Sequence, residues 1–277
     1  MGKNVFVLTY HSIHVDGTGY ATNDHIGFAK DIEYLHQAGF HFIGLERVID
    51  AVISGCWDDI PDRSVALTMD DGSWFDWYDL PHPSFGKQRS MVNILRDFQA
   101  KHGRMAQPEL QVTSFVIGSP KAREELDKTC MIGKGWWKDD WWAAAHAEGL
   151  AKIANHSWDH RHASLPSDFH YPGCSDYGHF NNLSNQEEAD WQIYQAQEYL
   201  RQVLGTNPLP AFAYPYGEVP EWVATEYFPA HGESMGILAA FTTKPEPVCS
   251  DSDRWRLPRY VFRNDWSSLA ELEQLLG

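Results

Sequence analysis

Short apolar runs alternate with longer mixed segments along the chain, and these two patterns predict strands and helices. Runs that are apolar throughout suit strands buried on both faces. Residues 5–10 form such a run, and further mainly apolar runs predict strands at 40–45, 64–69, 112–117, 150–155, 211–214, 238–242 and 257–262. Helix-start residues, helical periodicity and terminal glycines predict helices at 24–37, 46–54, 87–102, 185–204 and 267–276, and another that ends at Gly149. Residues 118–135 are predicted to be irregular.

The alternation of strand and helix favours a parallel sheet covered by helices. A chain of 277 residues is near the size of one (β/α) barrel. The sequence contains no internal repeat, low-complexity tract or linker. We therefore predict an α/β fold, a distorted (β/α)7-8 barrel, with residues 1–277 as a single domain.

Residues that could take part in catalysis or metal binding follow several of the predicted strands, and (β/α) barrels carry their functional side chains at these strand ends. These residues are His11, Asp70, Asp71, His156, Tyr216 and Gly217. Adjacent carboxylates repel each other, so the pKa of one should rise unless a cation lies between them. Asp70 and Asp71 therefore indicate chemistry or a metal, and a solvated turn is the alternative, since Asp and Gly are common turn residues.

His156 and His160 lie four residues apart, just after a predicted strand. Two imidazoles and one carboxylate form a three-ligand set for Zn²⁺ or a similar divalent cation, which leaves positions for water and substrate. Among 14 histidines the spacing by itself is weak. A polar loop with one histidine bound to a backbone carbonyl is the alternative.

The composition limits the partners of the chain. Its net charge of −16 disfavours nucleic acid and anionic membrane surfaces but leaves neutral sugars open. The four cysteines show no CxxC spacing, so neither a zinc knuckle nor a disulfide scaffold is predicted. No apolar run is long enough for a transmembrane helix, and no signal peptide is visible. We expect a cytoplasmic protein as the chain stands, or an exported one if a leader has been removed. The oligomeric state is not predicted.

Two long loops, residues 73–90 and 161–183, are rich in aromatic residues, and loops of this length are usually functional. Trp74, Trp77 and Trp158 are candidates for stacking on sugar rings, or they hold these loops against the barrel rim. Three loop histidines could reach the same site; they are His82, His170 and His179.

Three of these segments, in order, carry a family resemblance. Thr-Met-Asp-Asp-Gly at 68–72, His-Ser-Trp-Asp-His at 156–160 and Phe-Ala-Tyr-Pro-Tyr-Gly at 212–217 resemble the motifs of the polysaccharide deacetylase family, carbohydrate esterase family 4 with its NodB-like domain. Leu-Thr-Tyr-His at 8–11 is similar to the start of its poly-N-acetylglucosamine deacetylase branch. Residues 113–118 are similar to another strand of the family, so the resemblance spans about residues 5–266.

The resemblance implies a metal-dependent hydrolase that removes N-acetyl groups from N-acetylglucosamine units of a polysaccharide or oligosaccharide. It implies these roles: Asp71, His156 and His160 as ligands of a divalent cation, most often Zn²⁺; Asp70 as the base that deprotonates the attacking water; and the Tyr216 N–H as an oxyanion donor.

Two positions depart from the common family pattern. The C-terminal histidine that usually acts as the acid is missing, and His11 is the proposed substitute. Ala213 stands where the family has an arginine that orients the base, and Arg259 is the candidate replacement. Asp265 and Trp266 resemble the family's fourth motif. The candidate substrate-binding residues are Trp74, Trp77, Tyr214 and Trp266.

Two alternatives remain open at this point. Relatives in the family act on other amides, such as formyl groups on lipid-linked sugars or ring amides of purines. The purine-type relatives lack the full metal triad, which this chain keeps. An inactive carbohydrate-binding relative is disfavoured by the intact set Asp70, Asp71, His156, His160 and His11.

Overall fold

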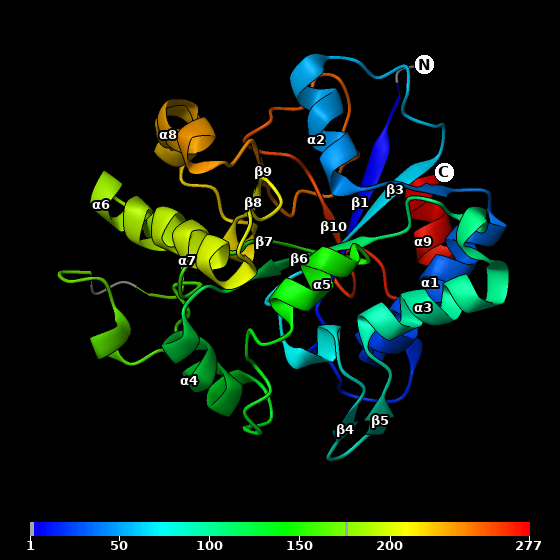
Figure 1. The fold of residues 1–277 in the computed structure, drawn as a ribbon, viewed down its shortest axis with the longest axis horizontal. Coiled ribbons are helices and arrows are strands. Elements are labelled where there is room, and N and C mark those ends of the chain that lie inside the picture. The colour runs from blue at the N-terminus through cyan, green and yellow to red at the C-terminus, as the bar shows by residue number, and fades with distance from the viewer. Residues whose placement is uncertain (1–2, 175–176) are drawn as a thin grey trace.

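The computed structural model describes residues 3–174 and 177–277, so only part of the predicted loop 161–183 lies within the described residues. Its centre is a parallel sheet in the order β10-β1-β3-β6-β7-β8-β9, with β2 pairing on β3 (Figure 1). The strands are β1 (Val5–Tyr10), β2 (His41–Phe42), β3 (Ser64–Met69), β6 (Val112–Val116), β7 (Ala151–Asn155), β8 (Ala211–Ala213), β9 (Ala239–Phe241) and β10 (Tyr260–Val261).

Residues 257–261 join the two edges of this sheet. Leu257 bridges to Phe241 of β9 in parallel, and three residues later β10 pairs with β1. The sheet therefore curls so that its first and last strands meet through this segment. The predicted fold class, an α/β chain with a distorted barrel, is confirmed.

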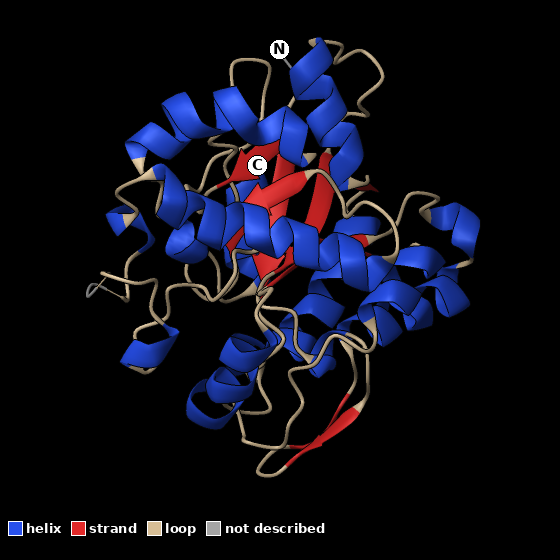
Figure 2. Cartoon of the chain, turned by 60° about the vertical axis from the view of Figure 1, so that its left-hand side comes forward, coloured by secondary structure: helices blue, strands red, loops and turns tan. Residues whose placement is uncertain are grey.

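Helices surround the sheet (Figure 2). They are α1 (Asp24–Gln37), α2 (Leu45–Ser54), α3 (Met91–His102), α4 (Pro120–Cys130), α5 (Trp142–Glu148), α6 (Gln186–Ala189), α7 (Gln195–Leu204), α8 (Phe228–Met235) and α9 (Leu269–Leu276). Within the described part of the chain, no helix has both the length and the apolar character needed to cross a bilayer.

The alternation of side chains along each strand divides the core into an inner and an outer layer. Along β3, Val65, Leu67 and Met69 belong to the cluster beneath the outer helices, whereas Ala66 belongs to the inner cluster. The same alternation continues past the strand end and points Asp70 inward. The inner cluster combines small and branched residues with the rings of Phe115 and Phe241, and the polar side chains at the barrel mouth lie beyond it.

The structure corrects several predicted elements. Residues 118–135 are not irregular, because α4 occupies most of them; Ser119 caps this helix by accepting from the Ala122 N–H, and Pro120 fits its first turn. The predicted helix 87–102 begins at residue 91, and a hairpin of β4 (Leu80–His82) and β5 (Gly86–Gln88) precedes it. The second predicted strand, 40–45, is reduced to two residues in β2.

Two further helical features were not predicted. A π-turn followed by α8 covers residues 223–235, where Pro229 and Gly232 hide the helical pattern. The predicted helix 185–204 is interrupted by a second π-turn, Asp190–Tyr194, between α6 and α7. Both π-turns lie in continuous helices, so apolar periodicity alone could not locate them.

Candidate active site

Loops that follow β1, β3, β7 and β8 converge on one cavity of about 350 Å³. The predicted site residues that line it are His11, Asp70, Asp71, His156, His160 and Tyr216. Strand alternation explains why His156 points towards the cavity, since it lies two residues beyond Ala154, which faces the barrel interior. The structure thus brings together side chains from four separate strand ends.

Asp71, His156 and His160 form a buried group that could hold a metal ion. One ligand atom from each lies within 4.8 Å of the other two. The Asp71 Oδ1 is 3.8 Å from His156 Nε2 and 4.0 Å from His160 Nε2. His156 Nδ1 lies 2.8 Å from the Ala213 carbonyl oxygen, a contact that places the proton on Nδ1 and leaves the Nε2 lone pair directed at the group.

The protonation states suit this role. Burial lowers the pKa of both histidines, so each imidazole is neutral and can donate a lone pair. Burial, Asp70 and Asp76 raise the pKa of Asp71 to about 8. A divalent cation beside Asp71 opposes that shift, because it stabilises the carboxylate. The donor set therefore fits a cation with two imidazole ligands and one carboxylate ligand.

Left-handed backbone conformations concentrate at this site. Asp71, Ser157, His160 and Tyr216 have φ values of 77°, 70°, 62° and 60°. Non-glycine residues rarely adopt such values, and they persist where surrounding contacts enforce them. Two such contacts are the Ser157 N–H donating to Asn155 Oδ1 and the His160 N–H donating to Ser157 Oγ, at 2.9 and 3.0 Å.

Asp70 pairs with Arg259 inside the barrel. The guanidinium donates to both carboxylate oxygens, Nη1 to Oδ1 at 2.7 Å and Nη2 to Oδ2 at 2.9 Å, and its Nε donates to the Thr242 carbonyl at 3.0 Å. Arg259 is fully buried and precedes β10 directly. Burial raises the pKa of Asp70, but Arg259 and His156 outweigh it and hold that pKa well below its usual range. Arg259 thus contacts Asp70 directly, from the segment that precedes β10.

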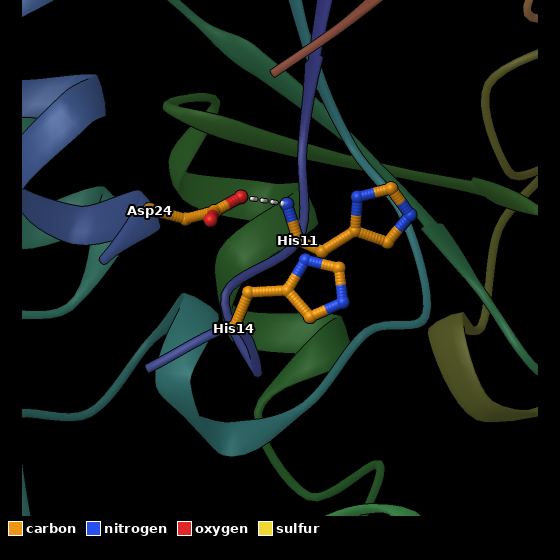
Figure 3. A group of neighbouring side chains, drawn as sticks. All are labelled: His11, His14 and Asp24. Atoms are coloured by element: carbon orange, nitrogen blue, oxygen red, sulfur yellow. Dashed lines mark hydrogen bonds between the residues drawn. The ribbon is translucent and has the colours of Figure 1, made fainter. Parts of the chain in front are cut away.

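His11 reaches the cavity from the end of β1 (Figure 3). Its main-chain N–H donates to Asp24 Oδ2 at 2.8 Å, and its ring points away from that carboxylate and stacks on His14 at 4.9 Å between ring centres. Burial lowers the pKa of His11 to about 3, although Asp70 acts in the opposite direction. The resting imidazole is therefore neutral.

Tyr216 borders the cavity in a tight turn formed by Pro215–Gly217. Gly217 has φ +69°, and a Cβ at this position would lie 1.9 Å from Thr243 Oγ1. Glycine is required here on both counts, because a side chain would meet Thr243 and disfavour the backbone angle. This turn sets the position of the Tyr216 main chain beside Asp71 and His160.

None of the four predicted substrate-binding side chains lines the cavity, as far as the described residues show. Trp74 Nε1 donates to Asp140 and Trp77 stacks on Trp141, so both anchor loops on the outside. Tyr214 points outward, where its hydroxyl donates to the Trp255 carbonyl. Trp266 is packed in the outer core and donates to Asp31. In the structure, these four side chains make packing and hydrogen-bond contacts away from the cavity.

Several cavity residues were not predicted. Trp137 lines the cavity and its Nε1 donates to the Asp71 carbonyl oxygen at 3.0 Å, which supports the left-handed conformation of that ligand. His14, Cys130 and His162 also line it, whereas His82, His170 and His179 do not. Only the general abundance of tryptophan hinted at Trp137, because its segment has no motif.

A family model identifies the family of this chain. A family model described as polysaccharide deacetylase matches residues 58–228, which is more than half of the chain. No curated protein sequence matches the chain.

Several solved structures share the fold over nearly the whole chain. The deacetylase PplD of Streptococcus pyogenes, in complex with acetate, is 17% identical with a TM-score of 0.65 and covers 100% of both chains. IcaB from Ammonifex degensii is 19% identical with a TM-score of 0.58 over 100% of this chain and 97% of its own. The BpsB deacetylase domain of Bordetella bronchiseptica is 16% identical with a TM-score of 0.59, over 95% of this chain and 97% of its own.

Proposed function

The chain belongs to the polysaccharide deacetylase family, and we propose that it uses a divalent cation to hydrolyse N-acetyl groups on N-acetylglucosamine units of a glycan. One observation carries the proposal: a buried Asp71–His156–His160 group adjoins a second acid, Asp70, that Arg259 keeps ionised. Zn²⁺ is the proposed cation, since it is commonly bound by two imidazoles and one carboxylate with a position left for water. Such a cation, when bound, lowers the pKa of a water molecule and polarises the acetamide carbonyl.

Asp70 is the proposed general base. Its carboxylate is within 3.9 Å of His156 Nε2, so it borders the position where the ligand atoms converge. The bidentate contact with Arg259 fixes its orientation and keeps it deprotonated. Asp70 can therefore accept a proton from water as that water attacks the amide carbon.

The tetrahedral product of that attack carries a negative oxygen, which the main-chain N–H of Tyr216 is proposed to stabilise. His11 is the proposed acid for the leaving amine. Because its resting imidazole is neutral, it must gain a proton during the reaction, and the charge of Asp70 favours the protonated form. Asp24 supports this role by anchoring the main chain of His11.

The test combines metal analysis with an assay for acetate released from N-acetylglucosamine oligomers. We expect about one divalent cation per chain, loss of that cation in His156→Ala, and cation retention without activity in Asp70→Asn. Asp58→Asn is the matched control, since Asp58 belongs to an exposed acid pair that does not line the cavity. Full activity of Asp70→Asn, or wild-type protein that binds no divalent cation, would contradict the mechanism. Release of formate from an N-formylated sugar, without acetate release, would favour the deformylase alternative.

A further inference from the structure

A second cavity, of about 500 Å³, lies on the other side of the loop that carries the two histidine ligands. Its walls include three half-buried aromatic rings and three polar side chains; they are Trp158, Phe169, Trp191, Lys121, Asp168 and Gln195. Trp158 stands between His156 and His160 in sequence, yet it contributes to this cavity rather than to the catalytic one. The role of this cavity is not explained by the proposed catalytic chemistry.

The two tryptophans form a corner. The ring centres of Trp158 and Trp191 are 6.5 Å apart and their planes meet at 75°. A sugar ring has apolar C–H faces and a rim of hydroxyl groups, so one face can stack on an indole while the second indole closes the side. The exposed carboxylate of Asp168 and the amide of Gln195 supply hydrogen-bonding groups for the rim. This combination of apolar walls with a few polar groups is typical of a small-molecule site.

A π-turn presents the second tryptophan. Trp191 lies in the π-turn Asp190–Tyr194, and Gln195 follows it one turn later on the same side. Within the turn, Gln192 is buried and its Nε2 donates to Asp159 Oδ1 at 2.7 Å. The turn is thus fastened to the ligand loop, and π-turns inside α-helices occur frequently at functional sites.

The ligand loop and α4 contribute residues to both cavities, although no described residue lines both. The Ser119 N–H donates to the Trp158 carbonyl oxygen at 2.6 Å, which ties the start of α4 to the ligand loop. Lys121, near the start of α4, lines the second cavity, and Cys130, at its end, lines the first. The nine helical steps from Lys121 to Cys130 correspond to a rise of about 14 Å along the helix axis. A glycan of a few sugar units is long enough to reach from one to the other.

We propose that this second cavity binds a further saccharide unit of the same glycan whose N-acetyl group is hydrolysed at the first. This inference rests on the proposed function for the identity of the glycan. The aromatic corner, the flanking hydrogen-bonding groups and the common ligand loop all favour a saccharide over other occupants.

Kinetics on substrates of two lengths test the inference. For Trp191→Ala we expect kcat/KM for a hexamer of N-acetylglucosamine to fall about tenfold, because a stacking surface is lost, with the value for the dimer unchanged. Trp191→Phe should retain most of the activity on the hexamer. Tyr194→Ala is the matched control: Tyr194 lies in the same π-turn, is 46% exposed and does not line the cavity. Equal losses on dimer and hexamer, or no loss on either, would overturn the inference.

A binding measurement separates this inference from the proposed function. In Asp70→Asn protein, which is expected to bind without turnover, calorimetry with the same hexamer should show about tenfold weaker binding when Trp191→Ala is added. Phe169→Ala, at another aromatic residue of the cavity lining, provides the same test if the tryptophan variant does not fold. Binding that depends on Trp191 without any acetate release from the wild type would support the second site and contradict the deacetylase proposal. Acetate release combined with binding unaffected by both variants would refute the second site alone.

Discussion

The buried pair of Asp70 and Arg259 allows a prediction with a defined magnitude. In Arg259→Met the side chain keeps its approximate volume but loses two hydrogen bonds to Asp70, one to the Thr242 carbonyl and a longer one to the Thr68 hydroxyl. Removing one partner of a buried ion pair costs about 3–5 kcal/mol, because the other charge remains buried and unpaired. For a chain of this size that loss corresponds to a fall in Tm of roughly 6–20 °C.

The effect should depend on pH in a specific direction. The folded-state pKa of Asp70 lies below the unfolded value, so its contribution to stability is present above pH ~4 and is lost as the pH falls through the folded-state pKa. The difference in unfolding free energy between wild type and Arg259→Met should therefore be largest near neutral pH and shrink below pH ~4. Without Arg259, burial raises the pKa of Asp70, so the acidic limb of kcat/KM should move to higher pH.

The assay is thermal unfolding across a pH series with a chelator present, so that bound cation does not contribute. The double variant Asp70→Asn/Arg259→Met should be more stable than Arg259→Met alone, because the unpaired charge is gone. Arg256→Ala is the control, since its partners are exposed and its loss should cost less than about 1 kcal/mol. A wild-type Tm and an unshifted acidic limb in Arg259→Met would refute the reasoning.

Three further predictions follow from the same site. Chelation should abolish activity and lower Tm. Zn²⁺ at a hundredfold excess over its Kd should restore about 2.7 kcal/mol of unfolding free energy, measured by calorimetry. An unchanged Tm would contradict the assignment of Asp71, His156 and His160 as cation ligands. His11→Ala should reduce kcat about 10²- to 10⁴-fold with cation content unchanged, measured by acetate release and metal analysis; a wild-type rate would exclude His11 as the acid. Gly217→Ala should lower both Tm and activity, and adding Thr243→Ala should relieve the clash but not the positive φ, so full recovery in the double variant would disprove the backbone argument.

The residues that could be predicted from sequence are those set by strand alternation and strand ends. β1, β3 and α1 have the predicted bounds, because continuous apolar runs and a clear helix start define them. Asp71, His156 and His160 could be assigned to one site because parallel strands end at the same edge of a sheet. Their roles as cation ligands stay a prediction until metal binding is measured.

The same alternation predicts that the Tyr214 side chain faces away from the barrel interior, which argues against Tyr214 as a substrate-binding residue. Ala211 and Ala213 face the barrel interior, so Phe212 and Tyr214 must face outward. The tryptophans were not predictable in this way, because indole rings pack equally well in a core and under a sugar. Trp74 is held by Asp140, which is 66 residues away, and Trp137 is held by the carbonyl of Asp71. No local pattern reports such distant partners.

The contact between Asp70 and Arg259 spans 189 residues, and this separation affects how the protein can be made. During synthesis β3 leaves the ribosome long before Arg259, so Asp70 has no counter-charge while most of the barrel is already available to fold. The late segment 257–261 supplies both the arginine and the link between the two sheet edges. Chains interrupted before Arg259 would keep an open sheet around an unpaired acid, and proteases should remove them instead of leaving a stable, inactive barrel.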